Sequence, residues 1–136
     1  MSTRTHHFTS PGASPGLSHL HSDHDQDAAL HLVDYGPDEL DEVVNPDEQR
    51  WSAPIADGHT RWLHVQGKPR PAFLHKLAEN FGLHVLALED VINVGQRPKF
   101  EIFGDWYFIV MQRPLLDDSG FRMEQVSIFL GDDCMI

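Results

Sequence analysis

The sequence lacks several features that would assign it to a common class. Its single cysteine, Cys134, excludes an internal disulfide, which fits a reducing compartment. No apolar run approaches the ~18 to 20 residues that cross a bilayer, and the longest, Trp106–Met111, has the length of a strand. The N-terminal stretch MSTRTHHFTSPGASPG has no apolar core of the kind found in signal peptides. We therefore expect a soluble chain, and its 136 residues fit one domain.

Basic residues are also scarce. The chain has 10 Lys and Arg against 21 Asp and Glu, giving a formal charge of -11. Residues 1–57 hold most of this excess of acids, whereas bases nearly balance acids in residues 58–136. Because nucleic acids are bound through clustered Lys and Arg, we expect no nucleic-acid partner. Acidic surfaces can attract cations, although most of them simply keep a protein soluble.

The first 27 residues differ in composition from the rest. They are rich in Ser, Gly, Pro and His, and large apolar residues are too few to offset the entropy of ordering, so we interpret them as a disordered tail. Within this tail, a His- and Asp-rich segment could hold zinc or nickel through His19, His21, Asp23 and His24. The spacing matches no closed structural site, and we therefore favour an unligated tail.

Residues 28–136 show the pattern of one α/β domain. Alternating apolar residues predict strands at 29–35, 60–66, 99–103, 106–113 and 123–130, with a last short strand from Cys134. Helices are predicted at 37–44, at 71–81 with Gly82 as a left-handed stop, and at 85–93. Residues 45–59 contain Pro46 and Pro54 and are expected to form an irregular connection. This order predicts an α/β sandwich with a mixed sheet.

Two adjacent acids, Glu89 and Asp90, lie on the last predicted helix. Neighbouring residues project about 100° apart on a helix, so at least one of the two must reach solvent or an interface. Magnesium prefers oxygen ligands and accepts one or two carboxylates while keeping much of its water. The residues alone favour a simpler interpretation, in which both acids solvate a short helix.

Other polar residues give weaker indications. Arg97 and Lys99 flank Pro98 and could contact an anion, but a turn held by ion pairs is the simpler interpretation. His84, just before a helix, is expected to cap it or to pack. The sequence has no Gly-rich phosphate loop, and Ser127 is not in a nucleophile elbow, so we expect no catalytic activity.

The stretch FGLHVLALEDVINVGQRPKFEIF at residues 81–103, followed by the aromatic strand WYFIV, resembles the cytoplasmic N-terminal domain of the CorA family of magnesium and cobalt transporters. The resemblance extends over residues 62–133. Its helix stop, Leu-Glu-Asp segment, Gln-Arg-Pro-Lys turn and aromatic strand follow the family's order and spacing. One departure is Val85, where the family usually has Pro, which bears on where the last helix starts.

The resemblance implies a mixed sheet flanked by helices in an α/β/α sandwich. It also implies a regulatory divalent-cation site where the domain meets a neighbouring protomer of a homopentamer. By position, Asp90 is the stronger candidate ligand and Glu89 the supporting one. The implied regulatory cation is Mg²⁺, with Co²⁺ or Zn²⁺ as alternatives, and bound ions would hold the pore closed when magnesium is plentiful.

The chain lacks the family's long stalk helix, two transmembrane helices and Gly-Met-Asn motif. We therefore expect a domain truncated before the stalk, at the cytoplasmic side of the cell inner membrane, that transports nothing alone and would reach the membrane only through the absent helices. Three alternatives stay open: the same domain of a zinc-transporting member, a stand-alone small-molecule-binding α/β domain, and a free-standing interaction domain. The second would need a pocket with convergent polar groups.

Overall fold

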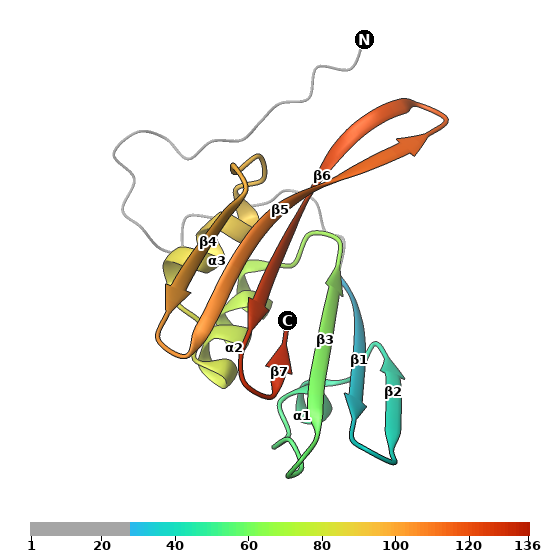
Figure 1. The fold of residues 1–136 in the computed structure, drawn as a ribbon, viewed down its shortest axis with the longest axis vertical. Helices are drawn as coiled ribbons and strands as arrows, with labels where there is room; N and C mark the ends of the chain where they lie inside the picture. The colour runs from blue at the N-terminus through green and yellow to red at the C-terminus, as the bar shows by residue number, and fades with distance from the viewer. Residues whose placement is uncertain (1–27) are drawn as a thin grey trace.

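The computed structural model describes residues 28–136, which form a seven-stranded sheet and three helices (Figure 1). The strands are β1 (Ala29–Tyr35), β2 (Leu40–Val44), β3 (Thr60–Gln66), β4 (Lys99–Phe103), β5 (Trp106–Asp117), β6 (Gly120–Leu130) and β7 (Cys134–Met135). The helices are α1 (Glu48–Trp51), α2 (Pro71–Phe81) and α3 (Val85–Ile92). Within this part of the chain, no helix has the length and apolar character needed to cross a membrane.

The short strand β7 joins two antiparallel halves of the sheet. The strand order is β2-β1-β3-β7-β6-β5-β4, and the pairing of β3 with β7 is the parallel one. Every other neighbouring pair is antiparallel. The sheet is therefore mixed, and the prediction of an α/β fold with a mixed sheet is confirmed.

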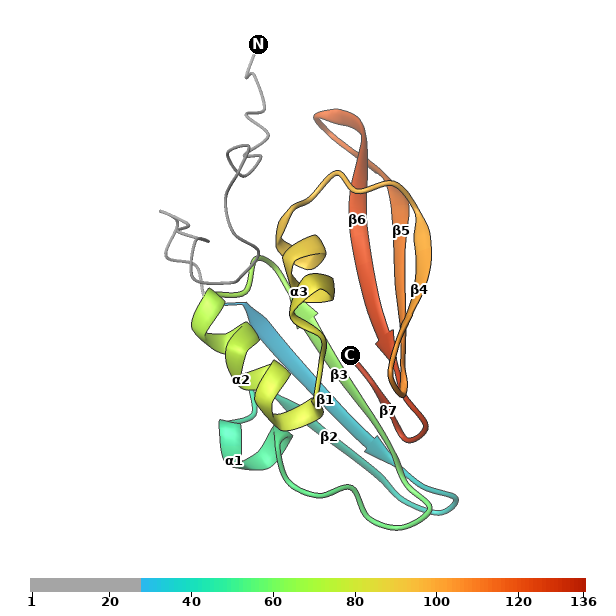
Figure 2. The ribbon, with the colours of Figure 1, turned by 90° about the vertical axis from the view of Figure 1, so that its left-hand side faces the viewer.

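The three helices lie on the same side of the sheet (Figure 2). Between them and the sheet lies a core made of Leu32, Trp51, Leu63, Leu74, Leu77, Leu83, Ala87, Leu88, Phe108, Val110 and Phe129. Trp51 packs between two rings of α2, with centroid distances of 5.8 Å to Phe73 and 6.0 Å to Phe81. The core thus anchors α2 and α3 against the middle of the sheet.

The opposite face of the sheet is open within residues 28–136. Side chains alternate between the two faces of a strand, so the neighbours of buried core residues point away from the helices. Several are large, apolar and exposed, namely Trp62, Phe100, Ile102, Tyr107 and Met111. The helices described here supply one of the two helical layers that the resemblance implies.

Most predicted elements are confirmed at nearly the predicted positions. Strands β1, β3 and β4 and helix α2 have the predicted bounds, and α3 ends one residue early at Ile92. Gly82 ends α2 with φ of 66°, a left-handed conformation that glycine adopts without steric cost. Helix α3 starts at Val85, with His84 as its N-cap, as predicted.

The predicted helix over residues 37–44 is wrong. Residues Leu40–Val44 instead form β2, which pairs with β1 through a turn in which the Gly36 N–H donates to the Glu39 carbonyl. Acidic residues near Pro37 suggested the start of a helix, but charged residues also suit an exposed edge strand. Pairing with β1 decides between these two local preferences.

Two further segments differ from the sequence-based expectation. The connection 45–59 contains one helical turn, α1, which Asp47 caps by accepting a hydrogen bond from the Arg50 N–H at 2.8 Å. The β5–β6 hairpin continues beyond Arg113 and projects from the sheet (Figure 1). Pro114 directly follows the predicted end of this strand, and it lies beyond the residues of β5 that pair with β4, where a strand tolerates proline.

Candidate metal site

Helix α3 presents the two predicted acids at the surface of the domain. Its start is capped by His84, whose Nδ1 accepts a hydrogen bond from the Leu86 N–H at 3.3 Å. The same imidazole stacks on Phe103 at a centroid distance of 4.7 Å, so both predicted roles of His84 are confirmed. Ala87 and Leu88 face the core, which leaves the acids that follow them partly exposed.

Asp90 forms an ion pair with Lys99 of β4. The Asp90 Oδ2 lies 2.6 Å from the Lys99 Nζ, and the two side chains are 23% and 28% exposed. The same Nζ lies 2.6 Å from the Glu101 Oε2, so one ammonium group sits between two carboxylates. Partial burial acts to lower the pKa of Lys99, but its bonds to Asp90 and Glu101 outweigh burial and raise the pKa above its usual value.

The end of α3 is fastened to the sheet by two glutamines. Gln125 of β6 accepts hydrogen bonds from the Gly95 and Gln96 N–H groups at 3.0 and 3.1 Å, and its amide donates to the Asp90 carbonyl at 2.8 Å. Gln112 of β5 donates to the Gln96 carbonyl at 3.0 Å. The backbone at Asp90 is therefore held in place while its carboxylate stays near solvent.

Sequence reasoning missed both glutamines. A signal for them exists, because each lies on the strand face that carries buried core residues such as Val110 and Phe129. A polar residue at a core-facing position needs a hydrogen-bond partner, and here the partner is the loop after α3.

The residues at this site fit a hard divalent cation. Asp90 and Glu101 offer carboxylate oxygens, and the position of the Lys99 ammonium shows where the fold stabilises positive charge. Glu89 is partly exposed and engages a partner of its own. In residues 28–136, no three His, Cys, Asp or Glu side chains gather closely enough to enclose a metal ion. The described chain thus provides one or two carboxylates, the number that Mg²⁺ accepts while keeping its water.

The remaining sequence candidates lie apart from this site. The ion pair of Lys99 with Asp90 confirms the prediction of ion pairing next to Pro98. Arg97, on the other side of Pro98, is exposed. The histidines considered as metal ligands in the tail lie outside the described residues.

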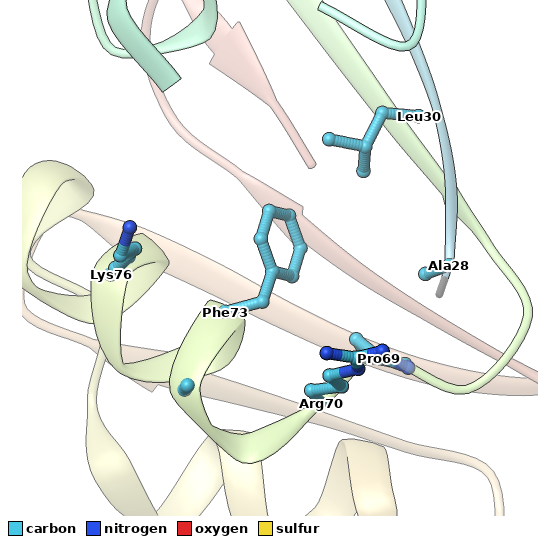
Figure 3. Close-up of a pocket in the computed structure, with 7 residues that line it drawn as sticks. Ala28, Leu30, Pro69, Arg70, Phe73 and Lys76 are labelled. Carbon is cyan, nitrogen blue, oxygen red and sulfur yellow. The ribbon is translucent and has the colours of Figure 1, made fainter. Parts of the chain in front are cut away.

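A cavity of about 300 Å³ lies between the start of β1 and helix α2 (Figure 3). The ring of Phe73 points toward Leu30 across it, and Lys76, which pairs with Glu48, lies at its rim. The full lining is Ala28, Leu30, Pro69, Arg70, Ala72, Phe73 and Lys76. It is mainly apolar and shares no residue with the Asp90 site.

A second charged cluster surrounds Arg61, which is only 1% exposed. Its Nε and Nη2 each donate to the Asp34 carboxylate at 2.7 Å, and its Nη1 donates to the Trp51 carbonyl at 2.9 Å. Arg50 also donates to Asp34, at 3.0 Å. The hydrogen bond from Arg61 is the main cause that lowers the pKa of Asp34, with a further contribution from Arg50 and against the effect of partial burial. This cluster joins β1, α1 and β3 and is saturated with partners.

The fold is similar to that of two solved CorA structures. It is similar to the complete CorA magnesium transporter of Methanocaldococcus jannaschii, with a TM-score of 0.60 and 20% identity over 78% of this chain and 30% of that one. It is also similar to the soluble domain of CorA from the same organism, with a TM-score of 0.54 and 16% identity over 76% of this chain and 38% of that one.

Sequence comparison defines the family. Residues 57–136 match the family described as CorA-like Mg²⁺ transporter protein. The chain is 31% identical over 128 residues to the cobalt/magnesium transport protein CorA of Thermotoga maritima, covering 92% of this chain. The chain therefore belongs to the CorA family. It spans 36% of the length of that relative.

Proposed function

We propose that this chain is the cation-sensing cytoplasmic domain of a CorA-like Mg²⁺/Co²⁺ transporter, with Asp90 as the main ligand of a regulatory Mg²⁺ and Glu89 as a supporting one. The observation that carries this proposal is the position of the Asp90 carboxylate. It is partly exposed, its residue is held in place through the backbone, and it already pairs with the positive charge of Lys99. Membership of the family supports the assignment to an ion transporter rather than an enzyme.

The proposed site is completed between protomers. One carboxylate from α3 satisfies part of a magnesium ion's shell, and water and a carboxylate of a neighbouring protomer supply the rest. A cation held in this way offsets the repulsion between the carboxylates that would face it from the two protomers. The assembly in this proposal is a homopentamer on the cytoplasmic side of the inner membrane.

Regulation follows from the difference in affinity between two arrangements of the protomers. A cation that bridges them binds the closed arrangement better, so plentiful magnesium shifts the population toward closure. When magnesium falls, the bridges dissociate and the pore opens. The isolated domain lacks the second protomer's ligand, and we expect it to bind Mg²⁺ with a dissociation constant of about millimolar, as suits one or two exposed carboxylates.

Two alternatives fit the described residues less well. A zinc-transporting member of the family would share this domain and differ in the pore, which the described residues do not include; the carboxylate oxygens of the Asp90 site favour magnesium, since zinc prefers nitrogen and sulfur ligands. A stand-alone small-molecule-binding domain would need convergent polar groups in a pocket, and the cavity beside Phe73 is mainly apolar.

Titration calorimetry of the chain with MgCl₂ tests the proposal. Asp90→Asn should remove the binding heat, and Glu89→Gln should weaken binding by a smaller factor. The matched control is Asp105→Asn, in the exposed turn between β4 and β5, which should bind as the wild type does. Binding that survives in Asp90→Asn at wild-type strength would disprove the assignment of this site.

A further inference from the structure

Lys99 occupies one oxygen of the carboxylate that the proposed site needs. Its Nζ lies 2.6 Å from the Asp90 Oδ2, a distance at which no divalent cation can share that oxygen without moving the ammonium group. The lysine comes from β4, nine residues beyond Asp90, so the two groups meet because the fold brings a β4 side chain to the surface of α3. The ion pair is thus a consequence of the fold.

The surroundings of Lys99 allow its head group to move without losing all its partners. Glu101 lies two residues along β4, its side chain is 41% exposed, and its Oε2 is also 2.6 Å from the Nζ. The Nζ lies 5.8 Å from the centroid of the Phe108 ring, which places the lysine against a buried surface. If the bond to Asp90 breaks, the ammonium group keeps Glu101 and the ring, so no charge is left unpaired in the protein.

We propose that Lys99 is a built-in competitor of the divalent cation for Asp90, and that this competition sets the concentration at which the site responds. The inference rests on the proposed function, because it concerns the same carboxylate. Lys99 and the cation compete for the Asp90 Oδ2, and the ammonium group moves to Glu101 when the cation binds there.

This arrangement weakens cation binding in two ways. The bond between Lys99 and Asp90 must be broken before the carboxylate can bind the cation, and the positive charge of Lys99 repels the cation from nearby. A partly exposed ion pair contributes little, and we expect its removal to tighten binding roughly two- to fivefold, or about 0.4 to 1 kcal/mol. A modest factor of this size suits a sensor that must release its ion when the concentration falls.

The test is calorimetric titration of the full chain with MgCl₂. Lys99→Met removes the charge and keeps an apolar side chain against Phe108, and it should bind Mg²⁺ about two- to fivefold more tightly than the wild type. Lys99→Arg retains the competing charge and should show no tightening. The matched control is Lys76→Met, which removes a lysine paired with Glu48 on α2, away from Asp90, and should change binding little.

Three results separate this inference from the proposed function. If Lys99→Met binds no more tightly than Lys76→Met while Asp90→Asn abolishes binding, the competition is disproved and the site stands. If Asp90→Asn binds as the wild type does, the site itself is disproved and the competition with it. If Lys99→Met tightens binding and the double variant with Asp90→Asn loses it, both are supported.

A measurement on the wild-type chain keeps the inference testable even if Lys99→Met folds poorly. In an NMR titration with MgCl₂, the side-chain signals of Lys99 should shift in parallel with the Asp90 amide, while those of Lys76 stay constant. Unchanged Lys99 signals at saturation of the Asp90 site would overturn the competition.

Discussion

The two charged clusters of this domain contain similar ion pairs, but the pairs around Asp34 are structural and the pair at Asp90 can exchange. Around Asp34, a buried arginine donates from all three nitrogens of its guanidinium to fixed oxygens, and Arg50 adds another bond. Around Asp90, one partly exposed lysine is shared by two carboxylates. The planar guanidinium suits a fixed set of hydrogen bonds, whereas the ammonium on its flexible side chain suits an ion pair that can be exchanged. Burial and the number of partners therefore distinguish a structural ion pair from one that can exchange for a cation.

The largest expected effect concerns the Asp34 cluster. Asp34→Asn leaves Arg61 buried without its counter-charge and should lower the free energy of unfolding by about 3 kcal/mol. Asp90→Asn breaks a more exposed pair, and we expect a loss of no more than about 1 kcal/mol. Urea denaturation of both variants measures the contrast. Equal losses would show that burial does not separate the two clusters.

The same cluster predicts a dependence of stability on acid. Because the folded state lowers the pKa of Asp34 below its usual 3.8, the stabilisation is fully present above that value and is lost as the pH falls through the folded pKa. Urea denaturation at neutral pH and below pH 3.8 should therefore show a loss in the wild type that is smaller in Asp34→Asn. Identical losses in the two proteins would indicate that other carboxylates control acid unfolding.

An intermediate effect is expected at the glutamine that holds the end of α3. Gln125→Leu leaves the Gly95 and Gln96 N–H groups without their acceptor and should cost about 1 kcal/mol, because both groups lie near solvent. The rate of hydrogen exchange should increase more at those two amides than at the amides of β6. Gln66→Leu, at an exposed position of β3, is the control and should change neither quantity appreciably. Unchanged exchange in Gln125→Leu would show that the loop does not depend on this side chain.

The smallest effect on stability is expected at Lys99. Lys99→Met should change the free energy of unfolding by less than about 1 kcal/mol, because the ion pair it removes is partly exposed. Thermal unfolding monitored by circular dichroism gives the value. A loss comparable with that of Asp34→Asn would mean that Lys99 is a structural residue, which would contradict its role as an exchangeable partner.

The sequence predicts the elements in which local signals agree with the tertiary structure. Alternation at 60–66 and the glycine stop at residue 82 give β3 and α2 with their observed bounds. The prediction of a helix at residues 37–44 is wrong because the acids and Pro37 in this segment suit either a helix start or an edge hairpin. Only the pairing with β1 selects the hairpin. The β5–β6 hairpin is longer than predicted because Pro114 is compatible with a strand that has no neighbour on one side there.

The candidate site was predictable in part. Helical geometry requires at least one of Glu89 and Asp90 to leave the core, and both are partly exposed. The pairing of Asp90 with Lys99 depends on the packing of α3 against β4, which no local pattern encodes. The same holds for Gln125, which reaches α3 across a separation of 35 residues.

The most direct test of the central claim uses Mn²⁺, which shares the preference of magnesium for carboxylate oxygen. In NMR spectra of the chain, substoichiometric Mn²⁺ should broaden the amide signals around Asp90 and of Lys99–Glu101 first, and Asp90→Asn should remove this broadening. Broadening centred elsewhere, with the signals of α3 remaining sharp, would contradict the account.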